Sequence, residues 1–160
     1  SRDGRLVYYR SDRTGRAEIW ARAASGEGEA RQVTHSGGER AQESDDGRLL
    51  YYASGFEHAQ LRRRVLPEGP ESVVPGVVLP QSADWLIRGK RLWMIQWSDQ
   101  HKEARVQWLD LATGQRQVLR GGAVRDTRGL TVDPGGRVVV WSSLAAPESD
   151  VWALRIRFPE

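Results

Sequence analysis

The sequence predicts an all-β protein, built from about four small antiparallel sheets of four strands each. Three observations lead to this prediction. One short sequence element recurs along the chain, each copy is followed by further runs of strand-forming residues, and the segments between these runs are rich in turn residues without helical periodicity.

The recurring element is a Gly at the end of a polar turn, followed by a basic residue and a run of apolar and aromatic residues. Successive copies are 43, 42 and 47 residues apart, measured between Gly4, Gly47, Gly89 and Gly136. Gly adopts the positive φ that tight hairpins need, so each copy predicts a hairpin turn. The aspartates before three of these glycines are therefore expected to shape turns and not to catalyse: Asp3, Asp46 and Asp133.

Each copy is followed by more strand-like runs, so that a full repeat holds four strands. The second run reads EIWARA, QLRRRVL, VQWLDL and VWALRI in the four repeats. A repeat of about 40–45 residues with four strands is typical of a β-propeller blade. Runs such as 49–53 and 138–141 are continuously apolar, which predicts middle strands covered on both faces.

The repeats divide the chain into predicted blades at about 1–38, 39–76, 77–122 and 123–160. The first blade lacks its leading strand and the fourth lacks its outer strand. Such an open arc would leave unpaired strand edges and apolar faces. We therefore expect a segment of a larger ring, with the remainder of that propeller as one partner.

The repeat resembles the TolB-like, WD-repeat-like β-propeller family. The clearest copy is residues 1–38, where Ser11–Gly15 matches the family's hairpin loop and Val33-Thr34 its outer strand. Residues 39–47 and the ending Glu148–Trp152 are similar to the propellers that follow a winged-helix DNA-binding domain in bacterial transcriptional regulators. The resemblance implies a bacterial protein, with the periplasm favoured over the cytoplasm, and a scaffold for protein or ligand binding.

Two other functions stay open under the same resemblance. The segment could be the propeller of a prolyl-oligopeptidase-like peptidase that gates a catalytic domain elsewhere, or part of a periplasmic TolB-like envelope protein. The parent reading frame would discriminate a regulator from a peptidase. A winged-helix domain upstream favours the regulator, and a hydrolase domain downstream favours the peptidase.

Composition and motifs give no support for an enzyme, a metal site or a cofactor. The chain has no Cys, and its three His residues fall in different repeats without ligand spacing. It contains no nucleophile elbow and no phosphate-binding loop. The net charge of +3 comes from interspersed Arg and acidic residues, so we expect no direct nucleic-acid contact. No apolar run is long enough to predict insertion into a membrane.

Binding is expected at the loops that join the strands, since the strands themselves are buried in blades. In a propeller, one set of these loops surrounds the central channel on one face. The chemistry-bearing residues of that set are the predicted contacts to a protein or small ligand: Arg13, His58, Trp97, Asp99 and His101.

Overall fold

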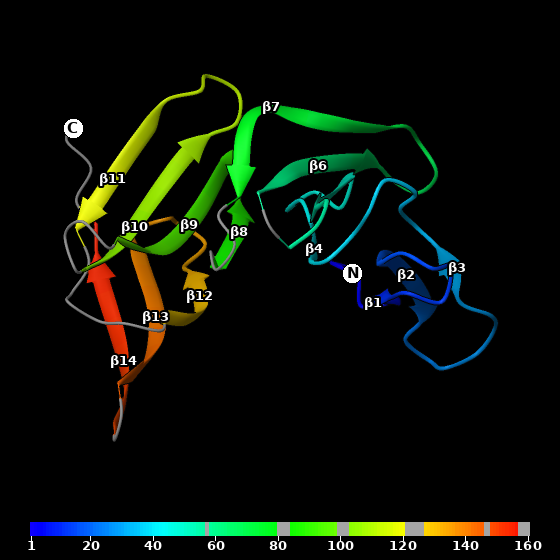
Figure 1. The fold of residues 1–160 in the computed structure, drawn as a ribbon, viewed down its shortest axis with the longest axis horizontal. Coiled ribbons are helices and arrows are strands. Elements are labelled where there is room, and N and C mark those ends of the chain that lie inside the picture. Colours follow the sequence, from blue (N-terminus) through cyan, green and yellow to red (C-terminus); the bar gives the residue numbers. More distant parts are fainter. Residues whose placement is uncertain (57, 80–83, 99–102, 121–126, 146–147, 157–160) are drawn as a thin grey trace. The chain divides into compact units, whose positions relative to one another are not determined.

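The computed structural model describes residues 1–160 apart from 57, 80–83, 99–102, 121–126, 146–147 and 157–160. Some side chains beside these gaps also lie outside the described part of the chain. The molecule divides into two compact units, Ser1–Gln81 and Ser82–Glu160. Figure 1 shows strands throughout both units.

The first unit contains two antiparallel sheets, with strand orders β1-β2-β3 and β4-β5-β6-β7. Neighbours in each sheet are consecutive in the sequence, as expected for a meander closed by short hairpins. The strands are β1 (Leu6–Ser11), β2 (Glu18–Ala23), β3 (Arg31–Gln32), β4 (Ala41–Glu43), β5 (Leu49–Ala53), β6 (Ala59–Val65) and β7 (Glu71–Leu79).

The second unit repeats this design in two further antiparallel sheets, with orders β8-β9-β10-β11 and β12-β13-β14. Figure 1 shows the former in green to yellow and the latter in orange to red. The strands are β8 (Asp84–Arg88), β9 (Arg91–Ser98), β10 (Glu103–Asp110), β11 (Arg116–Arg120), β12 (Thr127–Val132), β13 (Val138–Ala145) and β14 (Glu148–Arg155).

The predicted Asp-Gly turns form as expected, and the structure shows what the aspartates do in them. Asp133 accepts hydrogen bonds from the backbone N–H groups of Gly135, Arg137 and Val138 at 3.1, 2.6 and 2.6 Å. Gly136 follows with a φ of 68°, a left-handed conformation that favours glycine. Asp3 and Asp46 each accept one backbone hydrogen bond, from the N–H two residues further along the chain, at 3.0 and 3.1 Å. The predicted turn role is thus confirmed.

The core of the first unit lies between its two sheets. Ile19, Ala21 and Val33 from the first sheet pack with Leu50 and Tyr52 from the second. In β5, Leu50 to Ala53 are buried at every position, so both faces of this strand are covered. A strand covered on both faces needs a continuous apolar run, which is what the sequence predicted for residues 49–53.

The core of the second unit is richer in tryptophan. Trp93, Trp108 and Trp141 are all buried within one cluster that joins its two sheets. Val106 and Val139 are fully buried in the same cluster. The strand prediction over 138–141 is confirmed, since these residues open β13.

The structure shows the all-β fold of successive small antiparallel sheets that the repeats predicted. The first and last sheets hold three strands in the described part of the chain, and the two between them hold four. The second sheet continues to Leu79, beyond the predicted blade boundary at 76. Among the described residues there is no helix of the length and hydropathy that a membrane span requires.

Candidate functional site

The loop between β1 and β2 carries Arg13, the first of the predicted contact residues. Its guanidinium carbon lies 4.3 Å from the ring centroid of Trp20 and 5.6 Å from that of Tyr9. Its Nη2 donates to Tyr9 Oη at 2.9 Å, and its Nε donates to Ser11 Oγ at 3.1 Å. Tyr9 and Trp20 are cross-strand partners, so they form one platform under the cation. The loop therefore presents an exposed positive charge in a defined position.

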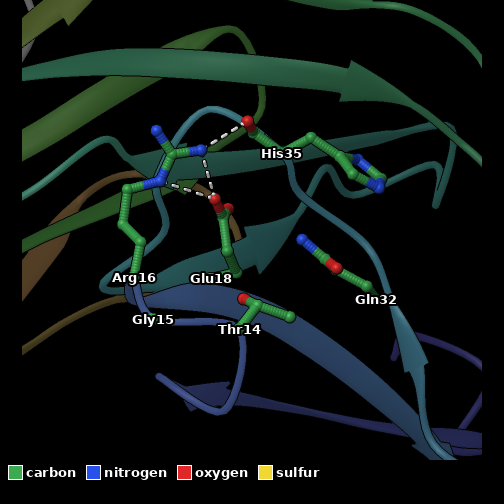
Figure 2. A pocket seen from close by; sticks show the side chains of 6 residues that line it. All are labelled: Thr14, Gly15, Arg16, Glu18, Gln32 and His35. Carbon is green, nitrogen blue, oxygen red and sulfur yellow. Dashed lines mark hydrogen bonds and ion pairs between the residues drawn. The ribbon is translucent and has the colours of Figure 1, made fainter.

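Beside this loop lies a polar pocket with a buried carboxylate in its wall (Figure 2). Glu18, the first residue of β2, is only 1% exposed. A buried carboxylate is costly unless hydrogen bonds satisfy it. The pocket is an open hollow of about 370 Å³, lined by Thr14, Gly15, Arg16, Glu18, Gln32 and His35.

The hydrogen bonds of Glu18 come from three directions. Arg16 donates to Oε1 from Nε at 2.9 Å and from Nη2 at 2.6 Å. Thr34 Oγ1 donates to Oε2 at 2.7 Å, and the backbone N–H of Gly37 lies 3.1 Å from both oxygens. Arg16 Nη2 also donates to the His35 carbonyl at 2.6 Å (Figure 2). The carboxylate is fully engaged, and its function is to hold the segment Thr34–Gly38.

A second carboxylate, Glu71 of β7, holds the same segment from the other sheet. The backbone N–H of His35 donates to Glu71 Oε1 at 2.9 Å, and Tyr52 Oη donates to Oε2 at 2.7 Å. Arg64 Nη1 donates to the carbonyl of Val33 and lies 3.5 Å from Glu71 Oε1. The connection between β3 and β4 is thus tied to both sheets of the unit.

These contacts shift the ionisation of the groups involved. Burial raises the pKa of Glu71, but hydrogen bonds from Tyr52, from the His35 backbone and from the side chains of Ser36 and His35 outweigh burial. The net pKa of Glu71 therefore lies below the ordinary value of 4.5. Burial and the hydrogen bond to Glu71 raise the pKa of Tyr52. At neutral pH the acid is ionised and the phenol is protonated, which is the donor–acceptor pairing that the geometry needs.

The five predicted contact residues are described to different extents. Arg13 lies in the β1–β2 loop, and His58 is exposed in the equivalent β5–β6 loop with a φ of 46°. The backbone of Trp97 belongs to β9, but its side chain lies outside the described part of the chain. Asp99 and His101 also lie outside the described residues. The grouping of all five on one face stays a prediction.

The residues that organise the loops were missed by reasoning from the sequence. Glu18, Thr34 and Glu71 carry the networks, yet none belongs to a catalytic or ligand motif. The available signal was a carboxylate at the start of the apolar EIW run, where an unpartnered charge would be unfavourable. Among the described residues, no group of three His, Cys, Asp or Glu is arranged to hold a metal ion.

Comparison with known proteins identifies the fold by its similarity to solved structures. No protein-family model and no curated protein matches the sequence. Among solved structures, a TolB from Agrobacterium tumefaciens matches 97% of this chain with a TM-score of 0.71 and 19% identity. The TolB of Acinetobacter baumannii matches 96% with a TM-score of 0.72 and 17% identity. This is a TolB-like β-propeller fold.

The chain spans 56% of the Agrobacterium protein and 38% of the Acinetobacter protein. Enzymes and binding proteins both occur among the further matches. A nidogen–laminin complex matches 93% of this chain and 56% of its own, at a TM-score of 0.64 and 13% identity. A structure of prolyl endopeptidases matches 96% of this chain and 25% of its own, at 0.62 and 19%. At these identities the likeness shows the fold alone.

Proposed function

We propose that the chain is a non-enzymatic segment of a larger β-propeller, and that its loops bind a protein partner. The observation that carries this proposal is that the charged residues of the first unit have two different roles. Glu18 and Glu71 use their carboxylates to fix loop backbone, whereas Arg13 stays exposed on an aromatic platform. Rigid loops that present exposed charged and aromatic groups suit recognition, because little conformational entropy is lost on binding.

One of the matched structures supports binding as a general role of this fold. It is a structure of a nidogen–laminin complex, so the chain that matches in it comes from a protein complex. For this chain, we propose the sensor or interaction region of a bacterial protein such as a winged-helix regulator. The resemblance of residues 39–47 and 148–152 to those propellers supports this finer proposal.

A second candidate function is the gating propeller of a peptidase. The match to prolyl endopeptidases, which covers 96% of this chain and 25% of theirs, favours it. In that case the catalytic groups would belong to a separate domain, and the propeller would only restrict access. Sequencing the parent gene discriminates the two, because only the peptidase requires a hydrolase domain in the same polypeptide.

The binding proposal is tested by affinity capture with the immobilised chain and its loop variants. Arg13→Ala and His58→Ala should each lower the affinity for the captured partner by about fivefold or more, as expected for the loss of a contact worth about 1 kcal/mol. Arg5→Ala is the matched control. Arg5 is a highly exposed arginine at the opposite end of β1 and should leave binding unchanged. If Arg13→Ala, His58→Ala and Arg5→Ala all bound the partner equally well, the β1–β2 and β5–β6 loops would be excluded as the binding surface.

A further inference from the structure

Two loops of the first unit, the β1–β2 loop and the β5–β6 loop, lie next to the same short segment of the β3–β4 connection. The Gly38 N–H donates at 2.9 Å to the carbonyl of Ala17, which ends the β1–β2 loop. The next residue, Glu39, donates its N–H at 3.0 Å to the carbonyl of Ala53, where β5 ends. These consecutive hydrogen bonds place the two loops side by side on one edge of the unit.

Two arginines beside these loops are neutralised by carboxylates of the same unit. Arg10 Nε lies 2.6 Å from Glu39 Oε2, and Arg16 Nη2 lies 2.6 Å from Glu18 Oε1. Arg13 differs from both, since within the described part of the chain its guanidinium donates to two uncharged hydroxyl groups and to no carboxylate. The edge therefore presents a positive charge that the unit itself does not balance by an ion pair among the described residues.

The guanidinium of Arg13 is also held in one position. It stacks on Trp20, and its Nε and Nη2 donate to the hydroxyls of Ser11 and Tyr9. Its Nη1 has no acceptor among the described residues and is available to a ligand. A planar guanidinium binds a carboxylate through two parallel hydrogen bonds, and one that is already immobilised loses little entropy on binding. The group that Arg13 fits is thus a carboxylate.

The neighbouring β5–β6 loop presents an aromatic side chain at the matching position. The first two repeats are closely similar in sequence up to Ser11 and Ser54, which allows both loops to be counted from these serines. Arg13 lies two residues beyond Ser11, and Phe56 lies two residues beyond Ser54. Phe56 is 68% exposed. Covering a phenyl ring removes a large apolar area from water, so an apolar group of a partner would be favourable here.

Each of the two loops contains a residue with left-handed backbone two positions further on. Gly15 has a φ of 86°, and His58 has a φ of 46°. This conformation is unfavourable for a residue with a Cβ, and residues that adopt it nevertheless concentrate at functional sites. The loop that carries Phe56 therefore keeps its shape at a cost, as expected where that shape serves recognition.

We propose that this edge binds a protein segment in which an acidic residue is combined with an apolar one, the carboxylate on Arg13 and the apolar side chain on Phe56. The inference rests on the proposed function, since it specifies the chemistry of the partner that the loops bind. Phe56 was not among the contacts predicted from the sequence, because a single phenylalanine in a loop belongs to no motif. Its exposure and its place beside the β1–β2 loop became evident only in the structure.

The test screens the immobilised chain against a positional-scanning library of short synthetic peptides. The bound peptides should combine Asp or Glu with Leu, Met or Phe at a constant spacing. Arg13→Glu should reverse the charge preference to Lys and Arg, and should lower the affinity for the best wild-type peptide at least about tenfold. Phe56→Ala should keep the acidic preference and lose the apolar one, with a loss of affinity of about fivefold. Arg5→Glu and Val65→Ala, exposed residues at the far ends of β1 and β6, are the matched controls and should change neither preference.

The absence of an acidic preference, or its survival in Arg13→Glu, would overturn the inference, as would an apolar preference that survives Phe56→Ala. Urea unfolding curves check that each variant keeps the fold. The outcomes also separate this inference from the proposed function. If a captured partner depends on Arg13 and His58 but the bound peptides lack this composition, only the chemistry inferred for the partner is wrong. If the loops bind neither a partner nor a peptide, the proposed function is wrong as well.

Discussion

Glu18 illustrates how a carboxylate can be buried in a small sheet. It is 1% exposed, and its oxygens accept from Arg16, from the Thr34 hydroxyl and from the Gly37 backbone. Thr34 Oγ1 in turn accepts from the Ile19 N–H at 2.8 Å. Each polar group in this chain of contacts has a partner, so the burial cost is offset only while the set is complete.

Removing the Glu18 carboxylate should therefore destabilise the first unit. Glu18→Ala leaves the Gly37 N–H and the Thr34 hydroxyl without their acceptor in a buried place, for which we expect a loss of about 2–4 kcal/mol in the free energy of unfolding. Urea denaturation measures the change. Glu68→Ala, at an exposed loop position, is the control and should change stability by less than about 0.5 kcal/mol. Similar small losses in both variants would contradict the structural role of Glu18.

At the scale of the element, the connection between β3 and β4 links the two sheets of the first unit. Glu18 holds it from β2 and Glu71 holds it from β7, so one short segment is bonded to two sheets. Its two glycines allow this close packing. A Cβ on Gly37 would collide with the Ser54 carbonyl, and one on Gly38 would lie 2.7 Å from Ile19.

Gly37→Ala should disrupt this connection. Gly37 has a φ of 88°, which strains an alanine, and the added methyl group would meet backbone that cannot move aside easily. We expect thermal or urea unfolding to show a loss of about 2–4 kcal/mol. Gly55→Ala is the matched control, since a Cβ there meets nothing within 4 Å. If the two alanine variants were equally stable, the close packing of the connection would be refuted.

At the scale of the whole molecule, acidic side chains that accept hydrogen bonds recur in every sheet. The pKa values of Asp3, Asp46, Asp110 and Asp133 all lie below the ordinary value of 3.8. For Asp133 and Asp110 the leading cause is a hydrogen bond from the backbone, and for Asp3 and Asp46 it is one from a serine hydroxyl. The pKa of Glu71 is also lowered, so the charged forms are favoured in the folded state.

Acid should consequently destabilise the protein over a defined range. A group whose pKa is lower in the folded state contributes stability above its unfolded pKa, about 3.9 for Asp and 4.3 for Glu, and loses it as the pH falls through the folded value. We expect the urea midpoint to be constant from pH 7 to about 5 and to fall below about pH 4. Asp133→Asn should show a shallower fall than the wild type. A midpoint that stays flat down to pH 3 would contradict the lowered pKa values.

Much of the architecture could be predicted from the sequence, because it depends on local chemistry. The Asp-Gly turns, the continuous apolar run over 49–53 and the run over 138–141 each specify a strand or hairpin from neighbouring residues alone. The likeness among repeats then predicted successive small antiparallel sheets, and the described residues form four of them, with three or four strands each.

The site could be predicted only in part. Arg13 was singled out as a charged loop residue, but its platform of Tyr9 and Trp20 depends on the cross-strand register. The pairing of Glu18 with Thr34, and of Glu71 with His35, joins residues 16 and 36 positions apart. No pattern among neighbouring residues predicts contacts between residues so far apart in the sequence.

What the sequence determined by itself is the repeat, since turn propensity and apolar periodicity act between near neighbours. What only the tertiary structure decided is how the polar residues are used. Burial makes an unpaired charge unfavourable, so the packing of two sheets selects which carboxylates must fix a loop and which side chains stay exposed.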